Sequence, residues 1–545
     1  MSKKESFIKG TLILAAAALV ARVLGLVQRV PLEHLLGDIG DASFSIANSV
    51  YLMLLTVATA GIPSTLSKMV SERYALNKPQ EARRVYQAAL IFAAGAGIVI
   101  TVLLYFGAPF YAQHIAKTPE AALSIQALAP ALLLFPTIAM MRGYFQGRGN
   151  MTAGGVSQIV EQFARVGIAI LLAYFLLQAG YSDTQVAAGA SFGGVFGSIG
   201  AFAVMLYYTF KMRRSDAANR ISEPLSEQVP LLQIYKSIFT LSIPIVLSSL
   251  AVPAVNFIDT SIVKTLLLDK IGEAAATETL GILGNRAQSI AGIPPILAIA
   301  LSQSLLPIIS AAFARKDSDH LRNQITSALR ISILTGMPIV IALCAAAYSV
   351  NGLLFSSLNG SGIIAALTFG TIFQITMMTT NSIIIGIGKP NISMISVAAG
   401  LIVKLAASWI LATWFGIYGI YGIIAATALC FLTITYLNLR VLKKVVSFSI
   451  LGGRWIGFIL TVLVAGAAGY GVNSLVLAVA GAAPSRIVFF AACILSGLTV
   501  VISYLVLLVL LRVLRRDELG SYPRVMQRVL RPLMRLQPGS SGQRG

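Results

Sequence analysis

Apolar segments follow one another along almost the whole of this chain, and only short polar connections separate them. A membrane-spanning helix needs about 20 apolar residues, which is the length of each segment. The 545 residues are 57% hydrophobic and only 11% charged, whereas a soluble domain carries about 25% charged residues. We therefore predict an all-α, polytopic membrane protein with about fourteen transmembrane helices. Their expected starts lie near residues 8, 43, 85, 121, 154, 184, 236, 280, 322, 362, 391, 418, 453 and 485.

The net charge of +21 comes from Lys and Arg that stand mainly in the predicted connections. We therefore expect no nucleic-acid partner. The connections on one side hold most of these cations, among them Arg83, Arg84, Arg142 and Arg148. The other side keeps only Arg29, Lys117, Lys264, Lys270 and Arg486. Because cytoplasmic loops are rich in Lys and Arg, both termini are predicted to be cytoplasmic.

An internal repeat predicts two lobes. The residues Ala60-Gly61-Ile62-Pro63 recur as Ala291-Gly292-Ile293-Pro294, and Arg83, Gly149 and Arg165 correspond to Arg322, Gly388 and Lys404. Repeated lobes with a site between them are typical of alternating-access transporters. The expected parts are an N-lobe of six helices (1–210), a cytoplasmic linker (211–235), a C-lobe of six helices (236–450), two further helices (451–514) and a basic cytoplasmic tail (515–545). The tail is expected either to lie on anionic lipid or to be solvated.

Four cations lie inside predicted spans, namely Arg22, Arg165, Arg286 and Lys404. Each costs roughly 2.5 to 3.5 kcal/mol at the bilayer centre, so each needs a wet cavity, an internal partner or an anionic ligand. The obvious acids at similar depth are Glu161 and Asp259. The excess of positive charge indicates a transport cavity for a negatively charged substrate.

Two helices carry the candidate substrate-binding residues. Arg22 and Arg29 are two helical turns apart and therefore share one face of the first helix. The eighth helix supplies Asn285, Arg286 and Gln288. Guanidinium groups bind phosphate oxygens as a bidentate fork, which favours a pyrophosphate ligand. The alternative is that these side chains only make hydrogen bonds between helices.

The remaining charges at membrane depth have two interpretations each. Glu161 and Arg165 are four residues apart and could neutralise each other. Asp259 could hold sodium or a proton, or it could form an ion pair with Lys404. We expect no cofactor and no metal site beyond this possible coupling ion. Catalytic motifs such as HExxH or a Ser-His-Asp set are missing, so we do not expect an enzyme.

Four segments resemble a known group of membrane proteins. They read SFIKGTLIL and RVLGLVQRVPLEHLLG at the start, AGIPSTLSKMVSERYA at 60–75, GYFQGRGNMTAGGVSQIVEQFAR at 143–165, and GNRAQSIAGIPPILAIALSQSLLP at 284–307. The chain is similar to the polysaccharide-biosynthesis branch of the multidrug/oligosaccharidyl-lipid/polysaccharide (MOP) flippase superfamily. The greatest likeness is to MurJ-type lipid II flippases and stage V sporulation protein B proteins.

The resemblance implies a cationic cavity between two lobes and a groove for a polyprenyl tail on the last two helices. It places Arg22 and Arg286 at the pyrophosphate and gives Asp41 the role of the acidic position after the first helix. The family's second arginine aligns with Gln28, one place before Arg29. The expected function is a monomeric flippase for a polyprenyl-pyrophosphate-linked saccharide, with lipid II preferred. The alternatives are an exporter of another polyprenyl-linked unit, an ion-coupled drug or metabolite exporter, and a non-transporting scaffold.

Overall fold

A computed structural model describes residues 7–59, 61–76, 78–218, 231–296, 298, 309–310, 312–313, 315, 317–355, 358–481 and 484–514. Within these ranges some side chains of the first, eighth and ninth helices, including that of Arg22, lie outside the description. The described residues form helices and connections, and none lies in a strand. This confirms the predicted all-α class. Twelve of the described helical segments are long and apolar enough to cross a membrane, and the count of fourteen stays a prediction.

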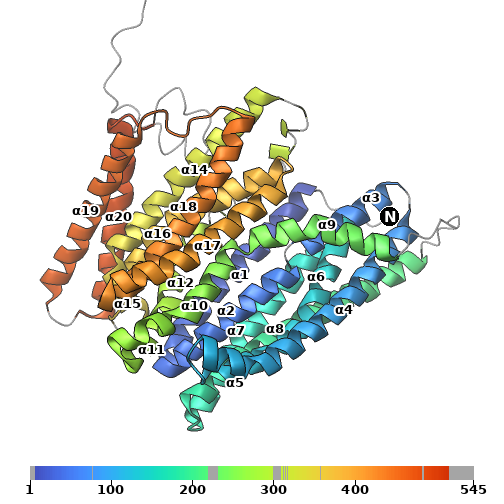
Figure 1. Ribbon diagram of the computed structural model, residues 1–545, viewed down its shortest axis with the longest axis horizontal. Coiled ribbons are helices and arrows are strands. Elements are labelled where there is room, and N and C mark those ends of the chain that lie inside the picture. The colour runs from blue at the N-terminus through green and yellow to red at the C-terminus, as the bar shows by residue number, and fades with distance from the viewer. Residues whose placement is uncertain are drawn as a thin grey trace, which may run out of the picture. The chain divides into compact units, whose positions relative to one another are not determined.

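The chain divides into two compact units (Figure 1). The first contains residues 1–285 and 409–423, and the second contains residues 286–408 and 424–545. This division groups residues 231–285 with the first unit, whereas the repeat assigns 236–285 to the C-lobe. Three elements have residues in both units: η2 (Ile282–Ala287), α17 (Pro390–Trp414) and α18 (Gly419–Val445).

The first unit holds most of the N-terminal helices. Its elements are α1 (Phe7–Leu35), α2 (Asp38–Thr59), α3 (Ile62–Ala75), α4 (Pro79–Phe110), η1 (Tyr111–Ile115), α5 (Ala121–Leu128), α6 (Ala131–Gly147), α7 (Thr152–Gln178), α8 (Asp183–Ala218), α9 (Leu231–Ser249), α10 (Ala251–Ile271), α11 (Glu273–Gly281) and η3 (Gly416–Tyr418). Helix α8 continues to Ala218 and α9 begins at Leu231. Both ends of the predicted linker 211–235 are therefore helical, and residues 219–230 lie outside the described part.

Three glycines on one face of α8 set the packing of α7 against α8, which run side by side in Figure 1. A Cβ atom on Gly189 would lie 2.3 Å from Leu176, and one on Gly193 would lie 2.7 Å from Ala169. At Gly197 it would lie 2.9 Å from the Arg165 side chain. Small residues four apart let two membrane helices approach at backbone distance. This spacing brings the polar residues of α7 close to α8.

A glycine separates α2 from α3. Gly61 has φ +75°, a left-handed conformation that favours glycine. A Cβ atom there would lie 3.0 Å from the Ser242 carbonyl of α9. Pro63 stands near the start of α3, where its missing N–H removes no helical hydrogen bond. Gly61 and Pro63 therefore mark the break between the two helices next to α9.

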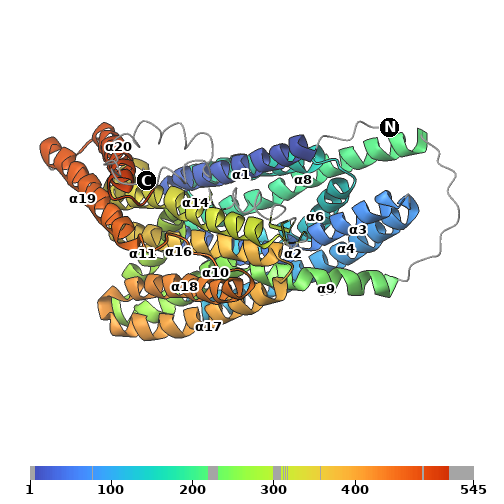
Figure 2. The same ribbon diagram turned by 90° about the horizontal axis from the view of Figure 1, so that it is seen from above.

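The second unit is built on α12 (Gln288–Ala291), α14 (Ser318–Ala345), α15 (Ala347–Leu354), α16 (Ser361–Gly386), α19 (Trp455–Ala480) and α20 (Arg486–Leu510). Helices α19 and α20 lie next to each other (Figure 2) and share a buried cluster with α14 and α16. The Tyr504 hydroxyl of α20 donates to the Leu334 carbonyl of α14 at 3.1 Å. The two last helices are thus packed into this unit. The predicted tail, 515–545, lies outside the described residues.

Candidate functional site

Three of the predicted substrate-binding residues come together in the first unit. Asp41 and Asn285 are both buried, with 5% and 1% of their surfaces exposed. The Asn285 Nδ2 atom donates to Asp41 Oδ1 at 2.6 Å. Arg29 Nη1 donates to the main-chain carbonyls of Gly284 and Asn285, both at 3.2 Å. We call Arg29, Asp41 and Asn285 the relay cluster, because Asn285 touches both charged residues.

Local backbone structure makes this meeting possible. Asn285 lies in η2, a π-helical turn, and such turns are frequent at functional sites. Glycines bring this segment against α2. A Cβ atom on Gly284 would lie 2.7 Å from the Ser45 Cβ, and one on Gly281 would lie 2.9 Å from Asp41 Oδ2. A side chain at position 284 would push η2 away from α2, and one at position 281 would displace the Asp41 carboxylate that Asn285 contacts.

The remaining predicted substrate residues are described less completely. Arg286 is buried in the second unit, with its guanidinium carbon 5.9 Å from the centre of the Phe355 ring. That distance is within the range of a cation–π interaction. Gln288 is half-buried at the start of α12. Arg22 lies in α1, but its side chain is outside the described residues. The meeting of Arg22, Arg29 and Arg286 around one ligand stays a prediction.

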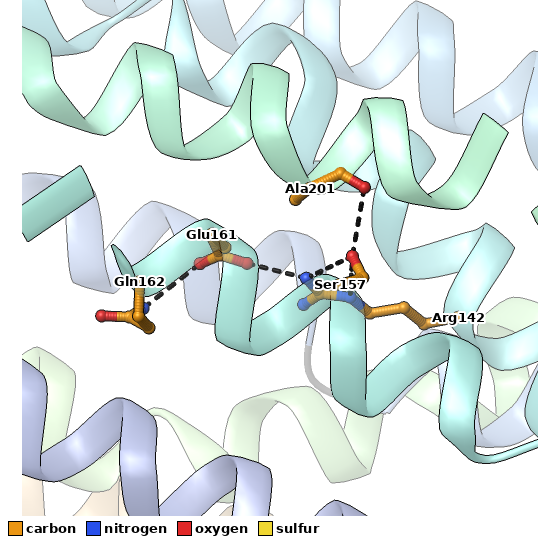
Figure 3. Close-up of polar contacts among 5 residues, drawn as sticks. All are labelled: Arg142, Ser157, Glu161, Gln162 and Ala201. Atoms are coloured by element: carbon orange, nitrogen blue, oxygen red, sulfur yellow. Dashed lines mark hydrogen bonds and ion pairs between the residues drawn. The ribbon is translucent and has the colours of Figure 1, made fainter. Parts of the chain in front are cut away.

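A second polar group ties three helices of the first unit together (Figure 3). Arg142 of α6 forms an ion pair with Glu161 of α7, Nη2 to Oε2 at 2.8 Å. The same nitrogen donates to the Ser157 hydroxyl at 2.9 Å. That hydroxyl donates to the Ala201 carbonyl of α8 at 3.1 Å. We call Arg142, Ser157 and Glu161 the paired cluster.

The structure corrects two sequence interpretations at this point. Glu161 pairs with Arg142 and not with Arg165, although Arg165 is only one turn away on the same helix. Arg165 instead donates to Asn48 Oδ1 at 3.4 Å and lies 5.6 Å from the centre of the Tyr51 ring, both on α2. Arg142, expected in a connection, lies inside α6. The rule for residues four apart considers one helix alone, so it cannot find a partner on a neighbouring helix.

Asp259 and Lys404 are both buried, in α10 and α17. Asp259 belongs to the first unit and Lys404 to the second. The hydroxyl next to Asp259, on Thr260, donates to the carbonyls of Asn256 and Phe257 at 3.1 and 3.2 Å. Among the residues that the structure describes, no three His, Cys, Asp or Glu side chains gather as ligands of one metal ion. The choice between a coupling ion and an ion pair stays open.

Sequence reasoning missed a further buried cation. Lys264, expected at a membrane surface, is buried in α10, and its Nζ lies 3.1 Å from Glu273 Oε1 of α11. Lys270 donates to the Ala412 carbonyl at 2.6 Å. Glu273 is nine residues beyond Lys264 and follows the glycine between α10 and α11. The sequence did contain a signal for this ion pair, because an acid just after a turn can face a cation on the preceding helix.

One more charged contact lies beyond the spans, where α6 and α8 end. Arg148 makes a bidentate contact with Asp216, both N···O distances being 2.8 Å. Its guanidinium carbon lies 5.2 Å from the centre of the Tyr74 ring. Burial is the largest single effect and lowers the pKa of Arg148, but the hydrogen bonds to Asp216, together with the charge interactions with Tyr144, Tyr74 and Asp216, raise it above its ordinary value. This contact fixes the end of α8 on the α6–α7 connection.

The fold and these polar clusters define a class of protein. The chain is a multi-pass, helical membrane protein with the fold of a transporter. A solved inward-facing structure of a multidrug resistance MATE family transporter of the MOP superfamily aligns with a TM-score of 0.62. The alignment has 14% sequence identity and covers 78% of this chain and 95% of that one. At this identity the likeness establishes the fold alone.

The sequence itself establishes the family. The profile of the polysaccharide biosynthesis protein family matches residues 7–313, more than half of the chain, and the chain belongs to this family.

Three relatives from Bacillus subtilis (strain 168) are similar over most of their length. The uncharacterized membrane protein YabM is 29% identical, with 81% of each chain covered. The lipid II flippase MurJ is 25% identical, covering 74% of this chain and 77% of that protein. Stage V sporulation protein B is 24% identical, covering 97% and 100%.

Proposed function

We propose that this protein is a flippase that moves a polyprenyl-pyrophosphate-linked saccharide, lipid II, from the inner to the outer leaflet of a bacterial plasma membrane. The observation that supports this most is the relay cluster, which sets a cation and an acid beside a π-helical turn. The family and the similarity to a lipid II flippase support the same class of substrate.

In the proposed mechanism, Arg29 binds the pyrophosphate together with Arg22 and Arg286. A guanidinium offers parallel N–H donors that match two phosphate oxygens, and it keeps its charge at any physiological pH. The contacts with the Gly284 and Asn285 carbonyls fix where the Arg29 fork lies. Asp41 accepts from the Asn285 side chain in turn, so that the acid helps to hold the turn whose carbonyls Arg29 contacts.

The membrane potential supplies part of the driving force in this proposal. An inside-negative potential favours outward movement of an anion by about 2.3 kcal/mol per charge and per 100 mV. The saccharide and pyrophosphate would cross through the polar interior while the tail stays in lipid. Asp259 and Lys404 are proposed to reset the cycle, either by binding sodium or a proton or by pairing with each other.

The decisive experiment is complementation of a bacterium depleted of its own lipid II flippase, with lipid II measured on the outer leaflet. We expect the wild-type chain to restore outer-leaflet lipid II. Arg29→Ala should lower the rate about 10- to 100-fold, since a hydrogen bond to a charged group contributes about 1.5–3 kcal/mol. Arg29→Lys should give an intermediate rate, because it keeps the charge and loses the fork.

The matched control is Arg213→Ala, which removes an exposed arginine of α8. This variant should transport at the wild-type rate at equal protein level. If the wild-type chain inserts correctly but moves no lipid II, another polyprenyl-linked saccharide becomes the substrate. If Arg29→Ala and Arg286→Ala both restore growth fully, a non-transporting scaffold explains the protein better.

A further inference from the structure

The first unit contains an apolar pocket that the proposed transport does not use. Its volume is about 310 Å³, at the lower end of the range for small-molecule sites, about 300–1,000 Å³. Helices α2, α4, α6 and α9 and the start of α3 line it. The lining residues are Val57, Ala58, Ile62, Phe92, Ala93, Ala96, Ile100, Pro136, Met140, Phe239, Ser242, Ile243, Val246 and Leu247.

The chemistry of the lining favours a hydrocarbon occupant. Ser242 is the one hydroxyl among the lining residues, and it donates to Thr65 Oγ1 at 2.9 Å. Phe92 and Phe239 meet edge to face, with ring centres 5.0 Å apart. Apolar cavities of this kind exclude water and take apolar molecules. Ile243 and Leu247 line the pocket and are also substantially exposed, at 48% and 39%. The pocket therefore borders the lipid-facing surface.

The lining residues of the pocket extend over most of the thickness of one membrane leaflet. Along α4 it extends from Phe92 to Ile100, and along α9 from Phe239 to Leu247, which is about 12 Å at 1.5 Å per residue on each helix. One leaflet of hydrocarbon is about 15 Å thick. Helices α4 and α9 run in the same direction along the pocket. The Tyr235 hydroxyl donates to the Ala88 carbonyl at 3.2 Å, and four residues later on both helices Phe239 contacts Phe92.

A cation stands at the end of the pocket. Lys236 is exposed on α9 and precedes Phe239 by three residues, about one helical turn. Residues 236, 239, 243 and 246 follow the spacing of a single helix face. Lys236 is therefore on the same helix face as the pocket lining and one turn before it, next to Tyr235, whose hydroxyl contacts Ala88.

We propose that this pocket binds one acyl chain of an anionic phospholipid, whose headgroup phosphate lies at Lys236. The depth of one leaflet fits an acyl chain, and a single lysine fits a single phosphate. The pocket also touches Val57, Ala58 and Ile62 on both sides of Gly61. A bound chain therefore supports the change of direction between α2 and α3.

The test uses the full chain in detergent micelles and a tryptophan reporter. Trp409, Trp414 and Trp455 are first replaced by phenylalanine, and Phe239→Trp is then introduced. Phosphatidylglycerol with brominated acyl chains, which quench tryptophan fluorescence on contact, is titrated in. We expect quenching that saturates at about one lipid per protein. The control Phe106→Trp, at an exposed position of α4, should be quenched only in proportion to the brominated lipid in the micelle.

Three further measurements test the parts of the proposal. Ala96→Phe fills the pocket and should abolish the saturable quenching, whereas Ala94→Phe, at an exposed position of α4, should not. Lys236→Gln should weaken binding of phosphatidylglycerol about fivefold, as expected for about 1 kcal/mol per lysine near an anionic headgroup. The same change at exposed Lys211 should have no effect. Phosphatidylcholine has the same phosphate but no net charge, so Lys236→Gln should weaken binding of its brominated form less than that of phosphatidylglycerol.

Clear results would overturn the proposal. One is quenching that rises in proportion to lipid at both reporter positions. Another is displacement of the brominated phospholipid by undecaprenyl pyrophosphate at a lower concentration than unlabelled phosphatidylglycerol, which would assign the pocket to a polyprenyl chain. An unchanged affinity in Lys236→Gln would remove the headgroup assignment. If Ala96→Phe does not fold, the titrations of the two reporters still decide the question.

Discussion

Two half-buried arginines of the first unit meet their surroundings in different ways. In the paired cluster, Arg142 contacts the Glu161 carboxylate directly at 2.8 Å. In the relay cluster, Arg29 donates to the main-chain carbonyls of Gly284 and Asn285, and the side-chain amide of Asn285 donates to Asp41. Both clusters contain one cation and one acid. They differ in whether a neutral residue touches both charges.

The difference separates a structural contact from one that a ligand can use. A direct pair in a membrane interior is strongly destabilised when one partner is removed, because the other charge is left buried. Arg29 donates to main-chain carbonyls, and such hydrogen bonds can be exchanged for bonds to phosphate oxygens. We therefore expect the paired cluster to govern stability and the relay cluster to govern transport.

The largest expected effect is on stability, from Arg142→Ala. It leaves Glu161, which is nearly fully buried, without its cation, and removal of one partner of a buried pair costs about 3–5 kcal/mol. Thermal unfolding of the purified protein should show a large fall in Tm, with transport per folded molecule unchanged. The double variant Arg142→Gln/Glu161→Gln should recover much of the loss. A single variant as stable as the wild type would contradict the pairing.

The next effect is on the relay cluster, from Asn285→Ala. It removes the donor to Asp41, a hydrogen bond to a charged group worth about 1.5–3 kcal/mol. Transport should fall, because the contact that holds the η2 turn beside Arg29 is lost. The matched control is Asn381→Ala, which removes a 2.6 Å amide–amide bond with Asn438 in the second unit. Equal losses of transport in the two variants would mean that the relay cluster is only structural.

The smallest effect is expected from Ser157→Ala, measured as the free energy of unfolding. Its hydroxyl accepts from Arg142 and donates to the Ala201 carbonyl, but the ion pair does not need it. A loss of about 0.5–1.5 kcal/mol is expected, the usual net worth of one hydrogen bond. A loss as large as that of Arg142→Ala would show that the hydroxyl, and not the carboxylate, holds Arg142 in place.

The fold could be predicted well from the sequence because lipid leaves few choices. Backbone groups in hydrocarbon must be satisfied within the segment, so an apolar run of sufficient length becomes a helix. Helix ends were less predictable. The segment 211–218 is polar, yet it continues α8, since Asp216 is anchored there by Arg148. That contact joins residues far apart in the sequence and leaves no local signal.

The candidate site could be predicted only in part. Arg29, Asp41 and Asn285 were each recognisable as charged or polar residues within or beside apolar segments. Their meeting depends on glycines at 281 and 284 that let η2 approach α2, and a sequence does not reveal which helix a glycine faces. The interpretation that pairs Glu161 with Arg165 failed for the same reason, because the actual partner, Arg142, lies on a different helix. Contacts within a helix follow from spacing, and contacts between helices do not.

The glycines of α8 have a consequence for how the first unit can move. Gly189, Gly193 and Gly197 each receive an atom of α7 in the space where a side chain would otherwise stand. Sliding α8 along α7 by a single residue can put Ala188, Phe192 and Phe196 in the places of the three glycines, where their side chains would meet those atoms. The two helices therefore cannot shift past each other gradually. We expect α7 and α8 to move together as a rigid body. Bending within the first unit is then left to breaks between helices, such as the one at Gly61.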